Sequence, residues 1–208
     1  MTARVPVLGP SVPRRGGAVT RAIGKMLVRA LGWRVAGNLP DLPKFIIIGA
    51  PHSSNWDFLV GIAIVFALNL RVTILAKSSL FKGPLGGLMR WLDVAPVDRS
   101  ASHGLVGECV ALFRNNEKMV LGITPEGTRN PGPRWKMGFY HIARQAGVPI
   151  ATIALDFRNR TLHIEPPLYP TGDVDADMAE LGRRYIGIEG KRRTMTDSPF
   201  LPGAGGRG

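Results

Sequence analysis

The sequence predicts a single α/β domain in which helices flank a mostly parallel central sheet. Short apolar runs alternate with longer segments of helical periodicity, which is the order that βαβ units produce. A length of 208 residues, with 45% hydrophobic and 20% charged residues, suits one domain with a substantial core. We expect this domain to span residues 19–194. The segments 1–18 and 195–208, interrupted by prolines and glycines, are expected to be mobile tails.

The expected strands are short apolar runs, and the clearest of them are Phe45–Ile48 and Met119–Ile123. In chain order, strands are predicted near residues 45–49, 72–76, 94–97, 119–123, 150–155 and 161–165. The turn Phe157–Arg160 separates the last two strands so closely that they are candidates for an antiparallel hairpin.

Helical periodicity predicts helices near residues 19–33, 55–69, 80–92, 102–115, 137–147 and 174–186. The apolar stretch Phe58–Leu70 is only 13 residues long, whereas a bilayer span needs about 20 apolar residues. We therefore expect a buried helix there and no transmembrane helix. Residues 1–20 contain three prolines and no apolar core, so no secretory signal is expected.

The first predicted helix, 19–33, has an apolar face with a basic stripe of Arg21, Lys25 and Arg29 beside it. The apolar face consists of Val19, Ala22, Ile23, Met26, Leu27, Ala30 and Leu31. Such a helix can pack on the core as an ordinary surface helix, or it can lie on an anionic lipid surface. The two roles can coexist.

The charge balance favours anionic partners. The chain has 27 basic and 15 acidic residues, a net charge of +12, which suits nucleic acid, acidic lipid headgroups or phosphorylated metabolites such as coenzyme A. The single cysteine, Cys109, excludes an intrachain disulfide and cysteine-rich zinc motifs, and it is compatible with a cytoplasmic setting. The remaining histidines have no spacing that indicates a metal site.

His52 and Asp57 are the strongest candidates for catalysis. They lie between the strand at 45–49 and the helix at 55–69. A histidine beside a carboxylate is the minimum equipment for taking a proton from a hydroxyl. The pair can meet if His52 lies in the loop and Asp57 in the first helical turn, with the N-cap at Ser54 or Asn55. Without that contact, Asp57 is only a favourable first-turn carboxylate.

A second polar cluster, Thr124–Arg129, follows the strand at 119–123. Ligands of parallel sheets bind at the carboxyl ends of the strands, so this cluster and His52 are expected to face one crevice. Arg129 can bind a phosphate through its planar guanidinium, and Glu126 can orient that arginine or hold a substrate hydroxyl. Arg99, after the strand at 94–97, and Lys136, before the helix at 137–147, add cations to the same edge.

These motifs resemble the signature blocks of the glycerolipid acyltransferases, and in particular the lysophospholipid (1-acylglycerol-3-phosphate) acyltransferase branch. The blocks, in order, are His52-x-x-x-x-Asp57, Asp98-Arg99, Pro125-Glu126-Gly127-Thr128-Arg129 and Gly147-Val148-Pro149-Ile150. The similarity covers roughly residues 30–165. It departs from the family pattern in the polar segment before Asp98, in Asn130 where serine is common, and in the missing second proline of the last block.

The resemblance implies a glycerol-3-phosphate acyltransferase-like fold and the transfer of a fatty acyl group from an acyl thioester to the free hydroxyl of a lysophospholipid. The donor would be acyl-CoA or acyl carrier protein, with no further cofactor. His52 would be the general base and Asp57 would orient it. The residues implied to bind the acceptor are Arg99, Glu126, Gly127, Thr128, Arg129 and Lys136. The enzyme would then lie peripherally on the cytoplasmic face of a membrane, through the 19–33 helix.

Three alternatives remain at this level. The acceptor can be a lyso-aminolipid, because Arg99 and Arg129 bind a carboxylate as readily as a phosphate. A second alternative is a catalytically silent lipid-binding relative. The third is a basic nucleic-acid-binding protein, although no helix-turn-helix, zinc-finger or aromatic RNA-binding signature is present, so nucleic acid is not the expected partner.

Overall fold

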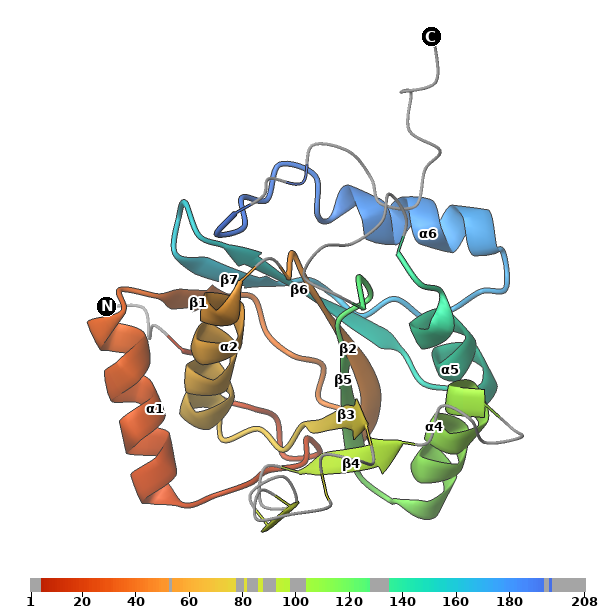
Figure 1. The fold of residues 1–208 in the computed structure, drawn as a ribbon, viewed down its shortest axis with the longest axis horizontal. Coiled ribbons are helices and arrows are strands. Elements are labelled where there is room, and N and C mark those ends of the chain that lie inside the picture. The colour runs from red at the N-terminus through yellow and green to blue at the C-terminus, as the bar shows by residue number, and fades with distance from the viewer. Residues whose placement is uncertain are drawn as a thin grey trace, which may run out of the picture.

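The computed structural model describes residues 5–52, 54–77, 81, 86–87, 93–97, 104–127, 135–192 and 195. Within them, seven strands form one sheet in the order β1-β7-β6-β2-β5-β3-β4 (Figure 1). The strands are β1 (Arg34–Ala36), β2 (Lys44–Ala50), β3 (Thr73–Lys77), β4 (Val94–Val97), β5 (Met119–Ile123), β6 (Ile150–Asp156) and β7 (Thr161–Ile164). Neighbouring strands are parallel except β6 and β7, which are antiparallel.

The predicted α/β class, the mostly parallel sheet and the final antiparallel hairpin are therefore confirmed. Strand β1 was not predicted, because it has only three residues and no apolar run. Its pairing with β7, from Arg34 opposite Thr161 to Ala36 opposite His163, depends on a partner more than 120 residues away. Local periodicity carries no signal for such a strand.

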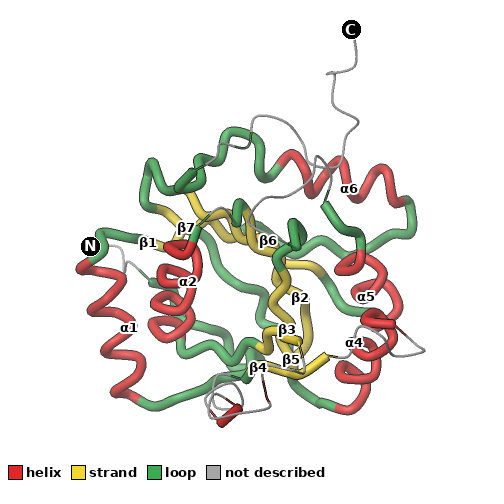
Figure 2. Tube along the Cα trace, in the orientation of Figure 1, coloured by secondary structure: helices red, strands yellow, loops and turns green. Residues whose placement is uncertain are grey.

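Helices cover both faces of the sheet (Figures 1 and 2). The helices are α1 (Ala18–Ala30), α2 (Asn55–Leu68), α4 (Gly104–Asn115), α5 (Gly138–Ala146) and α6 (Val174–Arg183). The alternation of β2 shows how the core is divided. Phe45 and Ile47 pack on the side of α1 and α2, whereas Ile46 and Ile48 pack on the side of α4 and α5. The predicted helix at 80–92 lies largely outside the described residues.

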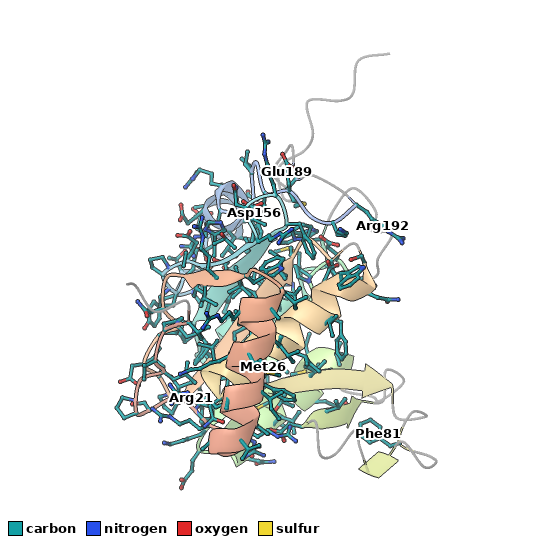
Figure 3. All side chains as sticks on the ribbon, turned by 90° about the vertical axis from the view of Figure 1, so that its left-hand side faces the viewer. Arg21, Met26, Phe81, Asp156, Glu189 and Arg192 are labelled. Carbon is teal, nitrogen blue, oxygen red and sulfur yellow. The ribbon has the colours of Figure 1, made fainter. Side chains whose placement is uncertain are left out.

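Helix α1 contacts α2 through a face different from the one its apolar periodicity predicts. Its buried residues are Gly24 and Val28. A Cβ at Gly24 would lie 2.2 Å from the main-chain nitrogen of Ala67, so glycine permits the close approach of the two helices. Val19 and Met26, which belong to the predicted apolar face, are 73% and 61% exposed. Figure 3 shows this side of the molecule, with Met26 and Arg21 labelled on α1.

The amino-terminal segment, in which a mobile tail was expected, contributes three side chains to the core. Val5, Leu8 and Val12 are buried in the core beneath α1 and α2, and the main-chain nitrogen of Arg15 donates to the carbonyl of Asn69 at 3.1 Å. Prolines exclude a regular helix from this segment, but they leave an extended chain that can bury alternate side chains. Part of the segment expected to be a tail is thus packed against the rest of the domain.

Of the expected carboxyl-terminal tail, 195–208, the structure describes Met195 alone. Met195, placed at the start of the second tail, is buried and exchanges main-chain hydrogen bonds with Gly187 and Ile188. Residues 196–208 lie outside the described part of the chain. In the part of the chain that the structure describes, no helix is both long and apolar enough to cross a bilayer.

Candidate active site

The site lies where β2 and β5 end side by side. Ile48 pairs with Ile123 in the parallel register, so the chain leaves both strands at the same edge of the sheet. The loop after β2 contains His52, and the turn after β5 contains Glu126 and Gly127. The carboxyl edge of a parallel sheet is the usual place for a ligand site, and here it brings together residues more than 70 positions apart.

Helix α2 begins with a capping box that fixes Asp57. Ser54 is the N-cap, and its hydroxyl accepts a hydrogen bond from the main-chain nitrogen of Trp56 at 3.2 Å. The main-chain nitrogen of Ser54 donates to Asp57 Oδ2 at 2.6 Å, and its hydroxyl donates to Asp57 Oδ1 at 3.1 Å. Both carboxylate oxygens are thereby oriented by the start of the helix. The loop-plus-first-turn arrangement expected for this motif is the one observed.

His52 lies beside this carboxylate. Its Nδ1 atom is 3.5 Å from Asp57 Oδ2, and the side chains of His52 and Asp57 are 23% and 2% exposed. A buried carboxylate facing Nδ1 favours the tautomer with the proton on that nitrogen. The Nε2 atom is then the basic nitrogen, and the exposure of His52 leaves part of the ring open to solvent.

Glu126 is a buried carboxylate that joins the two loops. It is 3% exposed, and its Oε2 atom accepts a hydrogen bond from the main-chain nitrogen of His52 at 3.2 Å. The sequence analysis expected Glu126 to orient an arginine or to hold a substrate hydroxyl. The observed contact is different in kind, because the carboxylate fixes the main chain of the candidate base.

Gly127 and Lys136 form the other side of the Glu126 turn. Gly127 has a φ of 69°, and a Cβ there would lie 3.2 Å from Nζ of Lys136. The main-chain nitrogen of Lys136 donates to the carbonyl of Pro125 at 2.9 Å. A residue without a side chain thus lets the lysine lie across the turn, with its ammonium group next to the segment that holds His52. Lys136 is exposed and can meet an anion from solvent.

The structure therefore brings together five of the predicted site residues: His52, Asp57, Glu126, Gly127 and Lys136. Arg99, Thr128 and Arg129 lie outside the described residues. Tyr185, which no sequence motif indicated, also contacts this region of the structure. Its hydroxyl donates to the carbonyl of Ile48 at 2.9 Å, and its ring meets Trp135 edge-on at 4.9 Å. No motif marks this tyrosine, because its partners are distant in the chain.

The fold and the site define an α/β domain with an imidazole and a buried carboxylate at the carboxyl edge of a parallel sheet. The model of the Acyltransferase family matches residues 34–156, which is more than half of the chain. This chain therefore belongs to the Acyltransferase family and is an acyl-transferring enzyme. The family assignment made from the four sequence blocks is confirmed.

A solved structure shows the same fold. The crystal structure of the 1-acyl-sn-glycerophosphate acyltransferase from Thermotoga maritima is similar with a TM-score of 0.56 and 21% sequence identity. The likeness covers 78% of this chain and 73% of that chain. Among curated proteins, none matches this sequence.

Proposed function

We propose that this acyltransferase moves a fatty acyl group from an acyl thioester, acyl-CoA or acyl carrier protein, to the free hydroxyl of a lysophospholipid such as 1-acylglycerol-3-phosphate. The observation that carries the proposal is the 3.5 Å approach of His52 Nδ1 to the buried carboxylate of Asp57. The named substrate of the Thermotoga maritima enzyme, 1-acyl-sn-glycerophosphate, supports this choice of acceptor.

In the proposed reaction, His52 Nε2 takes the proton of the acceptor hydroxyl as the oxygen attacks the thioester carbonyl. A C–O bond forms, and the carbonyl becomes a tetrahedral oxyanion. When the oxyanion collapses, the C–S bond breaks and the imidazolium returns its proton to the leaving thiolate. Asp57 stabilises the imidazolium between these two steps and keeps the ring in the productive orientation.

The acceptor's phosphate needs cations close to His52. Lys136 supplies one, because its ammonium group lies next to Gly127 in the turn that holds the His52 main chain. We propose that Arg99 and Arg129 supply the others, with Glu126, Gly127 and Thr128 completing the acceptor site. Guanidinium groups suit a phosphate through paired hydrogen bonds.

The test compares the purified protein with its His52→Ala variant on a panel of lysolipids, using labelled acyl-CoA and acylated carrier protein and detecting the product by mass. We expect the variant to lose about 10²–10⁴-fold in kcat. His141→Ala is the matched control, because His141 is exposed on α5 and is not among the residues of the candidate site. Full activity in His52→Ala would refute the mechanism. Acylation of lyso-aminolipids in place of lysophospholipids would refute the acceptor.

We also propose that α1 and α2 dock the enzyme on an anionic membrane as a peripheral protein. The two helices lie side by side on one face of the sheet (Figures 1 and 3). Each exposes large apolar side chains, which we call the α1–α2 apolar surface: Val19, Ile23, Met26, Trp56, Phe58 and Leu59. Lys25 and Arg29 are exposed on α1 as well. Apolar side chains with adjacent basic residues suit acidic lipid headgroups.

Vesicle sedimentation tests this docking surface. Replacing Ile23 and Met26 by Asp should reduce binding to phosphatidylglycerol vesicles, whereas Tyr169→Asp, which removes an exposed apolar residue outside both helices, should not. Replacing Lys25 and Arg29 by Glu should weaken binding by about 30-fold or more, because each basic residue contributes about 1 kcal/mol near such a surface. Equal binding of all variants would refute the proposal.

A further inference from the structure

Tyr185 is a buried side chain that contacts β2, the strand before the His52 loop, and Trp135, the neighbour of Lys136 in the chain. It lies just after α6 (Val174–Arg183) and is 0% exposed. It is also beyond residue 156, where the match to the Acyltransferase family model ends. A tyrosine hydroxyl in the core needs a hydrogen-bond partner. The identity of that partner indicates which part of the structure Tyr185 restrains.

The partner is the main chain that leads to His52. The Tyr185 hydroxyl donates to the carbonyl of Ile48 at 2.9 Å, four residues before His52. Ile48 belongs to β2 near its carboxyl end, where the chain leaves the sheet for the catalytic loop. A hydrogen bond at this point restrains the direction in which the loop emerges.

The ring of Tyr185 restrains the second segment. It packs edge-on against Trp135, with ring centroids 4.9 Å apart. Trp135 immediately precedes Lys136, whose main-chain nitrogen bonds the carbonyl of Pro125 at 2.9 Å. Tyr185 is thus connected through Trp135 to the turn that carries Glu126, while its hydroxyl is connected to the strand that carries His52.

The electrostatic surroundings agree with this position. Burial raises the pKa of Tyr185 well above its ordinary value. The negative charge of Glu126 adds to the rise, whereas Arg184 and a hydrogen bond with the main chain of Ile153 oppose it. The hydroxyl therefore stays protonated at neutral pH and remains a hydrogen-bond donor. A group that is 0% exposed also has no surface for a substrate to contact.

Tyr185 is itself held firmly by its neighbour. The guanidinium of Arg184 donates to the carbonyl of Pro166 at 2.7 Å and to Thr152 Oγ1 at 3.3 Å, and it pairs with Glu180 at 3.1 Å. Thr152 lies on β6, the strand next to β2, and pairs with Ile48 in the parallel register. The segment that presents Tyr185 is therefore anchored to the same sheet that it restrains.

We propose that Tyr185 is a positioning residue for acyl transfer. It holds the carboxyl end of β2 and the Glu126 turn in a fixed relative position, so that His52 reaches the acceptor hydroxyl. This inference rests on the proposed function, in which His52 is the base. It assigns a catalytic contribution to a part of the chain that lies outside the match to the family model.

The experiment compares Tyr185→Phe with Tyr140→Phe. Tyr140 is a matched control because it is also 0% exposed and its hydroxyl donates to a buried acceptor, Asp177, at 2.8 Å. That hydrogen bond joins α5 to α6 and includes no residue of β2, of the His52 loop or of the Glu126 turn. Both variants should show a similar fall in melting temperature. Only Tyr185→Phe should lose about tenfold or more in kcat, with both KM values within about threefold of the wild type.

A second measurement needs no substrate. The imidazole ¹⁵N resonances of His52, assigned from the His52→Ala spectrum, should shift in Tyr185→Phe and stay unchanged in Tyr140→Phe. Wild-type positions in Tyr185→Phe, or an equal loss of kcat in Tyr140→Phe, would overturn the positioning role. A wild-type protein that acylates no lysolipid would refute the proposed function instead, and the resonances would still test the restraint on His52.

Discussion

The carboxylate of Glu126 accepts a hydrogen bond from the main-chain nitrogen of His52 at 3.2 Å, across 74 positions of sequence. This contact ties the loop after β2 to the turn after β5. Because Glu126 is buried, the hydrogen bond is shielded from competing water. The candidate base is thus held at two points: its ring faces Asp57, and its main chain is fixed by Glu126.

Glu126→Ala should lower both stability and activity. The substitution leaves a partly buried main-chain N–H without its acceptor, which costs about 1–3 kcal/mol, and it frees the loop that carries His52. Glu126→Gln keeps an oxygen that can accept the same hydrogen bond, so its free energy of unfolding should stay within about 1 kcal/mol of the wild type. Urea denaturation gives both values, and equal stability of the two variants would contradict the role of this hydrogen bond.

Asp57→Asn and Asp57→Ala should separate the helix cap from the chemistry. The amide oxygen of Asn can still accept from the main-chain nitrogen of Ser54, whereas Ala removes both contacts with Ser54. We expect Asp57→Ala to lose about 1–3 kcal/mol of stability and Asp57→Asn to lose little. Both variants should lose much of the 10²–10⁴-fold rate enhancement that a correctly oriented general base contributes. Single-turnover rates, compared with thermal melts, test this separation.

Two glycines within helices should respond to alanine in opposite directions. At Gly24 the new Cβ would meet the main chain of Ala67 at 2.2 Å, and a backbone atom cannot move aside as a side chain can. Gly24→Ala should therefore destabilise the protein by about 1–3 kcal/mol or more. At Gly61 in α2 nothing lies within 4 Å of the new methyl group, so Gly61→Ala should gain about 0.5–1 kcal/mol. Calorimetric melting that moved both variants the same way would argue against the close contact of α1 and α2.

Cys109 should be unreactive in the folded protein. Burial, with a smaller contribution from the charge of Glu108, raises the pKa of its thiol to about 11. Only a small fraction of thiolate is then present at pH 8, and the side chain is 0% exposed. Labelling with a thiol reagent at pH 8 should proceed at the rate of unfolding, and urea should accelerate it.

The raised pKa of the Cys109 thiol also determines how the free energy of unfolding changes with pH. A thiol whose pKa is higher in the folded state stabilises that state fully below the pKa of the unfolded chain, near 9. This contribution falls as pH rises from about 9 towards 11. The difference in urea midpoint between the wild type and Cys109→Ala should therefore shrink over that range. A constant difference would contradict the raised pKa.

Much of the site was predictable because its determinants are local. The strand at 45–49, the helix start at Ser54 and the polar residues between them lie within a dozen positions, so periodicity and capping chemistry place His52 and Asp57 correctly. The order of strands and helices then puts the turn after β5 at the same edge. The hydrogen bond between Glu126 and the main-chain nitrogen of His52 was not predicted, because a contact across 74 positions cannot be inferred from the residues next to Glu126 in the sequence.

The sequence alone was thus sufficient to predict the α/β class, the final antiparallel hairpin and the family blocks. Each of these depends on residues that are close together in the chain or that occur in a set order. Only the tertiary structure showed which side of α1 faces the core, that Val5, Leu8 and Val12 are buried, and that the Tyr185 hydroxyl donates to the carbonyl of Ile48. These outcomes follow from the packing of distant surfaces. At Gly24 it is the main chain of Ala67, and not the apolar stripe of α1 itself, that determines how the helix lies.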